Sequence, residues 1–222
     1  SASDVDSTEL FFDESSDTSA VTVSVVDDSL TMTPAADWNG TANITVIVSD
    51  GLLADTSTFA LTITPVNDAP TIVLPSNFTF DEDGSLIEDF SAYIDDIDQD
   101  GLVLTAEGND SITVDIVAFD VTFGSAQDWN GTETLTFTVN DNHGRAIASD
   151  DVEIVVDPVN DAPVLEAIAD TSTFEDVPLT IALSASDVDS TELFFDESSD
   201  TSAVTVSVVD DSLTMTPAAD WN

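Results

Sequence analysis

Residues 44–70 read ITVIVSDGLLADTSTFALTITPVNDAP and contain two short apolar runs separated by a turn. The runs at 44–48 and 59–63 follow a period of two and are rich in Val, Ile, Thr and Phe. This period, with these residue types, is typical of half-buried β-strands. Because Asp, Gly and Pro bound the runs, the stretch predicts two strands followed by a Pro-containing linker.

The sequence also repeats itself. Residues 1–39 return letter for letter as residues 184–222. Three shorter motifs, DWNG, VNDAP and an Asp-x-Asp pair, recur at about half that displacement, with spacings of 91 to 93 residues. Identity at this level indicates a recent duplication, and the shorter period is the size of one small domain.

The VNDAP motif suggests where one repeat ends and the next begins. On that basis, residues 67–159 form one complete domain. Residues 1–66 are then a partial domain that lacks its N-terminal part, and residues 160–222 are a partial domain that lacks its C-terminal part. We therefore expect the sequence to be a window cut from a longer array of repeats.

Strand-like runs continue along the whole chain. Further runs lie at 20–26, 112–117, 135–139 and 152–156. No segment shows a sustained helical period, and turn residues separate the runs. Six or seven strands in each repeat predict an all-β fold of tandem immunoglobulin-like, cadherin-like Greek-key sandwiches in an extended array.

The charge balance is extreme. The chain has 46 acidic residues and one basic residue, Arg145, which gives a formal net charge of -45. This charge excludes a nucleic acid or an anionic membrane surface as a partner. It also opposes a compact state by self-repulsion, so the charge must be screened by salt or neutralised by bound divalent cations.

Other features of composition limit the class of protein. Apolar residues make up 42% of the chain and alternate with polar ones, so a core can form despite the charge. There is no Cys, so neither a disulfide nor a thiolate metal site can hold the fold together. The sequence contains no apolar run of 18 residues and no signal peptide, so we expect no membrane insertion within this segment.

The acidic residues of the complete domain gather in predicted loops. They and one Asn comprise Glu82, Asp83, Asp95, Asp96, Asp98, Asp100, Asp128, Asp141, Asp157, Asn160 and Asp161. Calcium takes six to eight oxygen ligands from such groups. Some clustering follows from the number of acids alone, but recurrence at the same phase of each repeat favours metal binding. The run DDIDQDG at 95–101 resembles part of an EF-hand loop, but it lacks flanking helices and a closing Glu.

Residues 44–70 resemble the end of a cadherin domain, in which an Asp-x-Gly-like turn leads into a last strand and an Asn-Asp-x-x-Pro-type linker. The repeat layout of the whole chain is more closely similar to the cadherin-like tandem repeats of large bacterial surface and secreted proteins. This resemblance implies Ca²⁺ bound where successive domains meet. The sequence departs from animal cadherins in carrying DWNG where they carry an Asp-Arg-Glu motif.

The resemblance implies three sets of calcium ligands, one for each junction. The first set is Asp37, Asn67, Asp68, Asp96, Asp98 and Asp141. The second set is Glu82, Asp128, Asn160, Asp161, Asp187 and Asp189. The third set, whose upstream half would lie outside the sequence, is Asp4, Asp6 and Asp50.

These inferences lead to a structural hypothesis. The chain is expected to be a calcium-rigidified repeat of an extracellular or cell-surface filament, stalk or giant adhesin, with further copies of the repeat as its partners. The alternative is a module that binds polysaccharide or another cell surface through the repeats themselves. The three Trp residues, each between Asp and Asn, are more simply packing anchors than ligand platforms. We expect no enzymatic activity, since the one His, His143, is more simply a turn residue than a general base.

Overall fold

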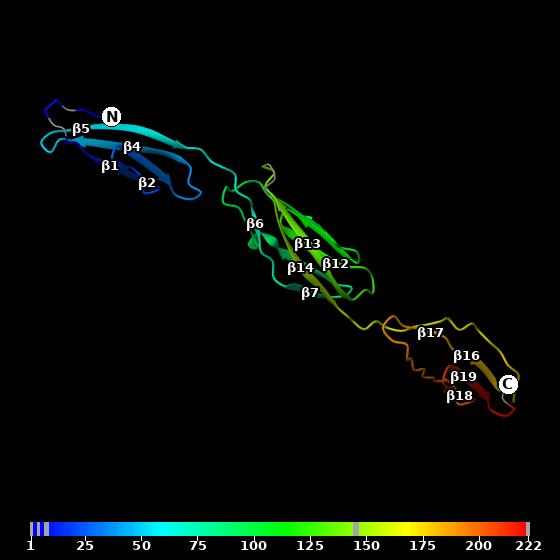
Figure 1. Ribbon diagram of the computed structural model, residues 1–222. Coiled ribbons are helices and arrows are strands. Elements are labelled where there is room, and N and C mark those ends of the chain that lie inside the picture. Colours follow the sequence, from blue (N-terminus) through cyan, green and yellow to red (C-terminus); the bar gives the residue numbers. More distant parts are fainter. Residues whose placement is uncertain (1, 4, 7–8, 144–146, 221–222) are drawn as a thin grey trace. The chain divides into compact units, whose positions relative to one another are not determined.

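The computed structural model describes residues 2–3, 5–6, 9–143 and 147–220 (Figure 1). Three residues named above, Asp4, Arg145 and Trp221, lie outside the described residues. The chain divides into two compact units. One unit comprises Ser1–Leu74, Phe90–Thr105 and Phe137–Asp150, and the other comprises Pro75–Asp89, Ala106–Thr136 and Asp151–Asn222.

The first part of the chain forms five strands. They are β1 (Phe11–Ser16), β2 (Val21–Val26), β3 (Ser29–Pro34), β4 (Gly40–Ser49) and β5 (Ala54–Ile63). Strands β1, β4 and β5 make an antiparallel sheet in that order, and β2 pairs with β3 as a hairpin. Val21, Ala42 and Ile44 are buried between them, because every second residue of β2 and β4 faces the same side.

The middle of the chain holds the largest set of strands. They are β6 (Thr71–Ile72), β7 (Asn77–Asp81), β8 (Ser85–Asp89), β9 (Ile94–Asp95), β10 (Val103–Glu107), β11 (Ile112–Val117), β12 (Asp120–Ser125), β13 (Gly131–Asn140) and β14 (Ile147–Asp157). One sheet has the order β10-β13-β14-β7 and another has the order β11-β12-β8, while β6 pairs with β9. Strand β7 runs parallel to β14, whereas β11 with β12, β12 with β8, and β6 with β9 are antiparallel.

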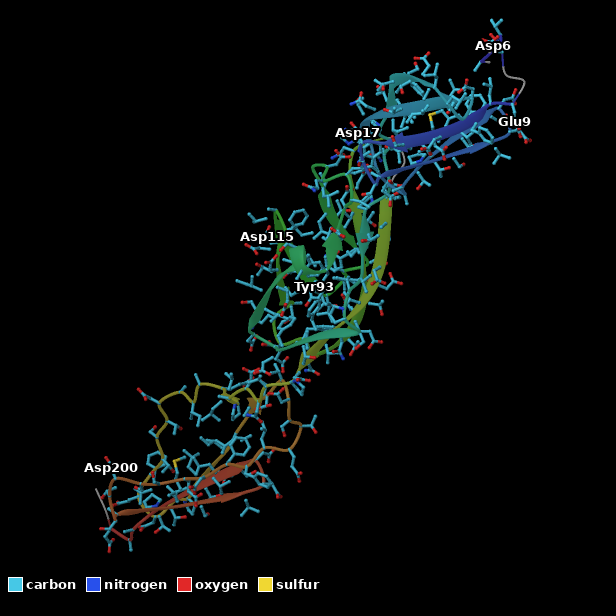
Figure 2. All side chains as sticks on the ribbon, turned by 90° about the vertical axis from the view of Figure 1, so that its left-hand side faces the viewer. Asp6, Glu9, Asp17, Tyr93, Asp115 and Asp200 are labelled. Atoms are coloured by element: carbon cyan, nitrogen blue, oxygen red, sulfur yellow. The ribbon has the colours of Figure 1, made fainter. Side chains whose placement is uncertain are left out.

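Aromatic side chains fill the core of this middle part. Phe137 on β13 is 0% exposed and lies against Phe90, with ring centroids 4.6 Å apart. Phe90 belongs to a single 3₁₀ turn (Phe90–Ala92), and Tyr93, labelled in Figure 2, packs edge-on against it at 5.8 Å. The sequence did not predict this turn. The turn is only three residues long, but it contributes to the core because it brings Phe90 against Phe137.

The last part of the chain forms β15 (Val164–Leu165), β16 (Leu179–Ala182), β17 (Ala185–Ser186), β18 (Val204–Val209) and β19 (Ser212–Pro217). The hairpin of β18 and β19 has the same register as that of β2 and β3, as their identical sequences require. However, FFDESS forms β1 at residues 11–16 and no strand at 194–199. The local sequence is the same, so pairing with β4 decides whether this segment is a strand.

The prediction of an all-β fold of immunoglobulin-like and cadherin-like type is confirmed. Each of the six predicted runs contains or lies within a strand, and the strands at 40–49, 54–63, 131–140 and 147–157 extend beyond the runs. The difference arises because polar Thr and Ser residues continue the backbone pairing past the apolar core. The division into three domains stays a prediction.

One carboxylate fixes the loop between β10 and β11. Glu133 on β13 accepts hydrogen bonds from the backbone N–H groups of Asp110, Ser111 and Ile112, at 2.7–3.2 Å. Burial alone would raise the pKa of Glu133, but these three N–H donors lower it overall. The carboxylate thereby holds the chain in place where β11 begins.

We expect Glu133→Ala to lower the free energy of unfolding by about 1–2 kcal/mol at neutral pH, because three backbone donors lose their acceptor at a partly exposed site. A lowered pKa means that this stabilisation is present above the unfolded-state pKa and is lost as pH falls through the folded-state pKa. Urea unfolding at neutral and acidic pH checks both points. Glu153→Ala, an exposed change on β14, is the control, and an equal loss in both variants would contradict the role of Glu133.

Candidate metal centres

An acidic loop follows β9. The carboxylates of Asp96, Asp98 and Asp100 each offer an oxygen, and these three atoms lie within 4.8 Å of one another. The Asp96 carboxylate accepts a hydrogen bond from the Asp98 N–H at 2.8 Å, and Gln99 turns the chain with a φ of 60°. The alternation of Asp in this tight turn therefore directs the three carboxylates to one place.

The first linker, which contains the VNDAP motif at residues 66–70, docks onto this loop. The backbone N–H of Asp68 donates to a carboxylate oxygen of Asp98 at 2.7 Å. The side-chain amide of Asn67 donates to Asp141 at 2.8 Å. Asp141 is only 1% exposed, and its pKa is lowered by the Asn67 amide and by the backbone N–H of His143. Linker and loop are thus joined through two carboxylates, of which that of Asp141 has a lowered pKa.

His143 lies at the edge of this cluster. Its Nδ1 is 3.3 Å from a carboxylate oxygen of Asp100 and 3.0 Å from the backbone oxygen of Asp141. The sequence predicted a turn residue beside Asp141. The structure places the ring next to Asp100 as well, where it orients the loop and remains largely exposed.

A second acidic cluster lies at the second linker, which contains the VNDAP motif at residues 159–163. Oxygen atoms of Asp83, Asp128 and Asp161 lie within 4.8 Å of one another. Asp83 occupies the turn between β7 and β8, and Asp128 precedes β13. Both have positive φ values, 59° and 53°, which Asp tolerates better than most residues. These backbone conformations bring residues from two separate loops to the linker residue Asp161.

Glu82, which precedes Asp83, contacts the second linker beside this cluster. Its side chain is 3% exposed and accepts a hydrogen bond from the backbone N–H of Val159 at 2.7 Å. It also accepts the side-chain amide of Asn130 at 3.3 and 3.4 Å. Burying a carboxylate without hydrogen-bond partners destabilises the fold. The N–H of Val159 and the amide of Asn130 supply such partners, so Glu82 can be buried where it meets the second linker.

The second linker is held in the same way as the first. The backbone N–H of Asp161 donates to Asp189 at 2.5 Å, as that of Asp68 donates to Asp98. Asp187 accepts from the N–H of Asp189 at 2.8 Å, as Asp96 accepts from that of Asp98. The Asp-x-Asp pair is therefore a repeated device that binds the linker backbone.

The chemistry of these groups fits calcium. Every candidate ligand is an oxygen, and carboxylates predominate, as Ca²⁺ prefers. One carboxylate oxygen of Asp96 and one of Asp161 are buried and have no hydrogen-bond partner. Burial, together with the charges of Asp83, Asp128, Asp189 and Glu82, raises the pKa of Asp161. A buried, unpartnered oxygen among like charges is a position where a cation would be favourable.

The structure brings together most of the first two predicted ligand sets. The first linker gathers Asn67, Asp68, Asp96, Asp98 and Asp141, and the second gathers Glu82, Asp128, Asp161, Asp187 and Asp189. The amide nitrogen of Asn160 donates to the backbone oxygen of Asp161 at 2.6 Å, as Asn67 donates to that of Asp68. The role of all these residues as metal ligands stays a prediction.

The remaining candidates lie elsewhere. Asp37 is exposed, has a φ of 56° and belongs to neither of the two carboxylate clusters found among the described residues. Asp50 closes the turn between β4 and β5 by accepting the N–H groups of Leu53 and Leu52, which lower its pKa. Asp6 is exposed and belongs to neither cluster, and Asp4 falls outside the described residues.

Two cluster residues, Asp83 and Asp100, were absent from the predicted ligand sets. The sequence grouped both with the acidic loop residues, but the family resemblance did not carry them over. Asp83 follows Glu82 directly, and Asp100 continues the alternation of Asp96 and Asp98. That alternation was the available signal for Asp100. For Asp83 the deciding feature is the positive φ of the turn, which the sequence does not display.

None of the helices in the described part of the chain has the length and apolar character that a bilayer crossing needs.

Comparison with family models gives two adjacent matches. Residues 1–64 match the model described as cadherin-like domain, and residues 67–155 match the model described as bacterial Ig domain. No curated protein matches the sequence.

Comparison with solved structures gives several similar chains. The EC1–3 segment of mouse protocadherin-24 has a TM-score of 0.53 at 14% identity, covering 94% of this chain and 76% of that one. Mouse clustered protocadherin PcdhgC3 EC1–3 has a TM-score of 0.43 at 13% identity, covering 82% of this chain and 67% of that one. The endo-fucoidan hydrolase MfFcnA4, from glycoside hydrolase family 107, has a TM-score of 0.39 at 16% identity. That match covers 95% of this chain and 34% of the hydrolase.

This chain therefore spans about a third of the length of that hydrolase. The likeness to protocadherin-24 supports the fold. The chain therefore combines similarity to a cadherin-like domain at residues 1–64 with similarity to a bacterial Ig domain at residues 67–155.

Proposed function

We propose that this chain is a calcium-binding structural repeat of an extracellular or cell-surface filament, stalk or adhesin, and that it has no catalytic role. The observation that carries this proposal is the repeated docking of a linker. The N–H of Asp68 binds Asp98 and that of Asp161 binds Asp189, each beside a cluster of three carboxylates. A device present at both linkers favours a structural role over a single binding site.

The residues that would hold calcium are those of the two clusters. Asp96, Asp98 and Asp100 would do so at the first linker, and Asp83, Asp128 and Asp161 at the second. When bound, the ion supplies positive charge and accepts several oxygen ligands with flexible geometry.

The chain's own groups prepare these places. The N–H of Asp98 orients Asp96, and buried Glu82 fixes the linker at Val159. In the absence of cations the carboxylates repel one another across a few ångströms. The repulsion opposes the docked linker and leaves it less restrained.

The net charge of -45 gives a second reason for the proposal. Neutralising facing carboxylates would stabilise each linker against bending, and repetition along an array would produce a stiff segment. Such a role suits an extracellular setting, where modules bind Ca²⁺ with Kd values of about 10⁻⁴–10⁻³ M.

Thermal unfolding of the full 222-residue chain in calcium and in chelator tests the proposal. At a concentration 100 times the Kd, each bound ion would add about 2.7 kcal/mol to the stability of the folded state. We expect a large rise in Tm with Ca²⁺, and a smaller one with NaCl at matched ionic strength, because diffuse screening lacks ligand geometry.

A double variant, Asp96→Asn with Asp98→Asn, should lose part of the calcium-dependent rise. The control removes the same amount of charge with Asp115→Asn and Asp120→Asn, two exposed changes on β11 and β12 away from both clusters; Asp115 is labelled in Figure 2. Equal Tm values in calcium and chelator would refute the proposal. They would instead favour the alternative, a module that binds polysaccharide or another cell surface.

A further inference from the structure

The motif DWNGT occurs at residues 37–41 and again at 128–132, and each copy contains an Asn-Gly pair. We infer that Asn39 is a site of spontaneous deamidation and that Glu82 protects the equivalent residue Asn130 from the same reaction. The inference concerns a chemical modification of the chain and does not depend on calcium. It rests on two copies of one sequence in two different surroundings.

The fold requires glycine in both pairs. Gly40 and Gly131 have φ values of 142° and 151°, which residues with a side chain rarely adopt. A Cβ added to Gly40 would lie 3.1 Å from the ring of Trp38, and one added to Gly131 would lie 3.0 Å from that of Trp129. The Trp ring therefore occupies the space that a side chain would need. An Asn-Gly pair is chemically labile because glycine has no side chain to shield its backbone nitrogen. Here a larger residue cannot replace the glycine, so the labile pair is retained.

The reaction needs only the chain and water. The backbone nitrogen of the glycine attacks Cγ of the asparagine side chain and loses its proton. A new C–N bond forms, the bond between Cγ and Nδ2 breaks, and the side-chain nitrogen leaves as ammonia with that proton. Water then opens the cyclic imide at either carbonyl, giving aspartate or isoaspartate. No oxidant or reductant takes part.

The two asparagines differ in what holds their amide groups. The Nδ2 of Asn130 is 3.3 and 3.4 Å from the carboxylate oxygens of Glu82. Glu82 is itself buried and fixed by the N–H of Val159. Within the described part of the chain, the side chain of Asn39 makes no hydrogen bond. The amide of Asn39 can therefore rotate toward Gly40, whereas that of Asn130 must first leave its acceptor.

The backbone at Asn39 also favours the reaction. Gly40 is the first residue of β4, and its pair with Ile63 is the outermost one between β4 and β5. Strand ends open more readily than strand centres, which frees the glycine nitrogen. Gly131 likewise begins β13, so this factor is shared and the hydrogen bonds from Asn130 to Glu82 remain the difference.

Deamidation would have unequal consequences. At Asn130 it would replace a donor to Glu82 with a carboxylate, and two like charges would then face each other at a buried group. At Asn39 it would add a charge to an exposed turn. The protected position is thus the one where the modification would damage the second linker.

The test is incubation of the full folded chain at mildly alkaline pH, with the mass gain of each site followed by peptide mass spectrometry. We expect Asn39 to react about tenfold faster than Asn130, because breaking a hydrogen bond to a charged group adds to the barrier. In concentrated urea the two rates should converge, since residues 37–41 and 128–132 are identical. Equal rates in the folded chain, a faster Asn130, or an undiminished difference in urea would each overturn the inference.

A variant separates protection by Glu82 from other features of the fold. Glu82→Ala should raise the rate at Asn130 and leave the rate at Asn39 unchanged in the same molecule. Circular dichroism would check that the variant is folded. If it does not fold, the comparison of folded and urea-treated unsubstituted chain still decides the question.

Discussion

Phe137→Ala is expected to lower the free energy of unfolding by about 3–5 kcal/mol, the range found when a buried aromatic side chain is replaced by alanine. Phe137 is 0% exposed, and its ring centroid is 4.6 Å from that of Phe90. The variant loses the burial of the ring and leaves a cavity that rigid β13 and its neighbours cannot close. A loss of this size is a large part of the stability of a domain.

Denaturant unfolding of the full chain, followed by amide hydrogen exchange in β13, measures this loss. Phe174→Ala is the matched control, because it makes the same chemical change at a side chain that is 83% exposed. We expect the control to change the unfolding midpoint little. Similar losses in the two variants would mean that the core of the middle part does not determine its stability.

Most strands could be predicted from the sequence because they depend on a local pattern. The period-two runs that became β11, β13 and β14 bury every second residue, so the pattern and the burial coincide. The 3₁₀ turn at Phe90–Ala92 has no such period, and its position depends on a contact with Phe137 from a distant strand.

The identical FFDESS segments show the limit of local prediction most directly. Residues 11–16 pair with β4, from Ser49 to Ile44, and form β1. Residues 194–199 have the same sequence and form no strand. A strand needs a partner for its backbone hydrogen bonds, and the identity of that partner is not contained in the six residues.

The candidate sites were predictable in part for the same reason. The alternation at Asp96 and Asp98 is visible in the sequence, and residues two apart in an extended segment project to one side. The joining of Asp83 and Asp128 to Asp161 depends on two left-handed backbone conformations and on the path of the linker. These features arise from the folded chain. Asp37 shares the DWNG motif and the φ value of Asp128, yet it belongs to neither cluster among the described residues.

Asp161→Asn is expected to change stability in opposite directions with and without calcium. In chelator the variant should melt at a higher temperature than the unsubstituted chain, because it removes a charge that faces Asp83 and Asp128. Burial and these neighbouring charges raise the pKa of Asp161, so its ionised form destabilises the folded state. With this sign, the protonated carboxyl contributes stability below its unfolded-state pKa, and that contribution is lost as pH rises through the folded-state pKa.

In calcium the order should reverse. Asn can offer one neutral oxygen in place of a carboxylate. The apparent affinity for Ca²⁺ at the second linker should therefore fall about tenfold or more, since changes to residues that only orient metal ligands already cause losses of this size. Titration calorimetry measures that affinity, and thermal unfolding in chelator and in calcium measures the reversal. Asp120→Asn, an exposed change at the first position of β12, is the charge-matched control and should leave calcium affinity almost unchanged. A calcium ligand destabilises the folded chain by charge repulsion when the ion is absent and stabilises it when the ion is bound. If Asp161→Asn raised the melting temperature under both conditions, Asp161 would therefore be a repelled carboxylate and not a ligand.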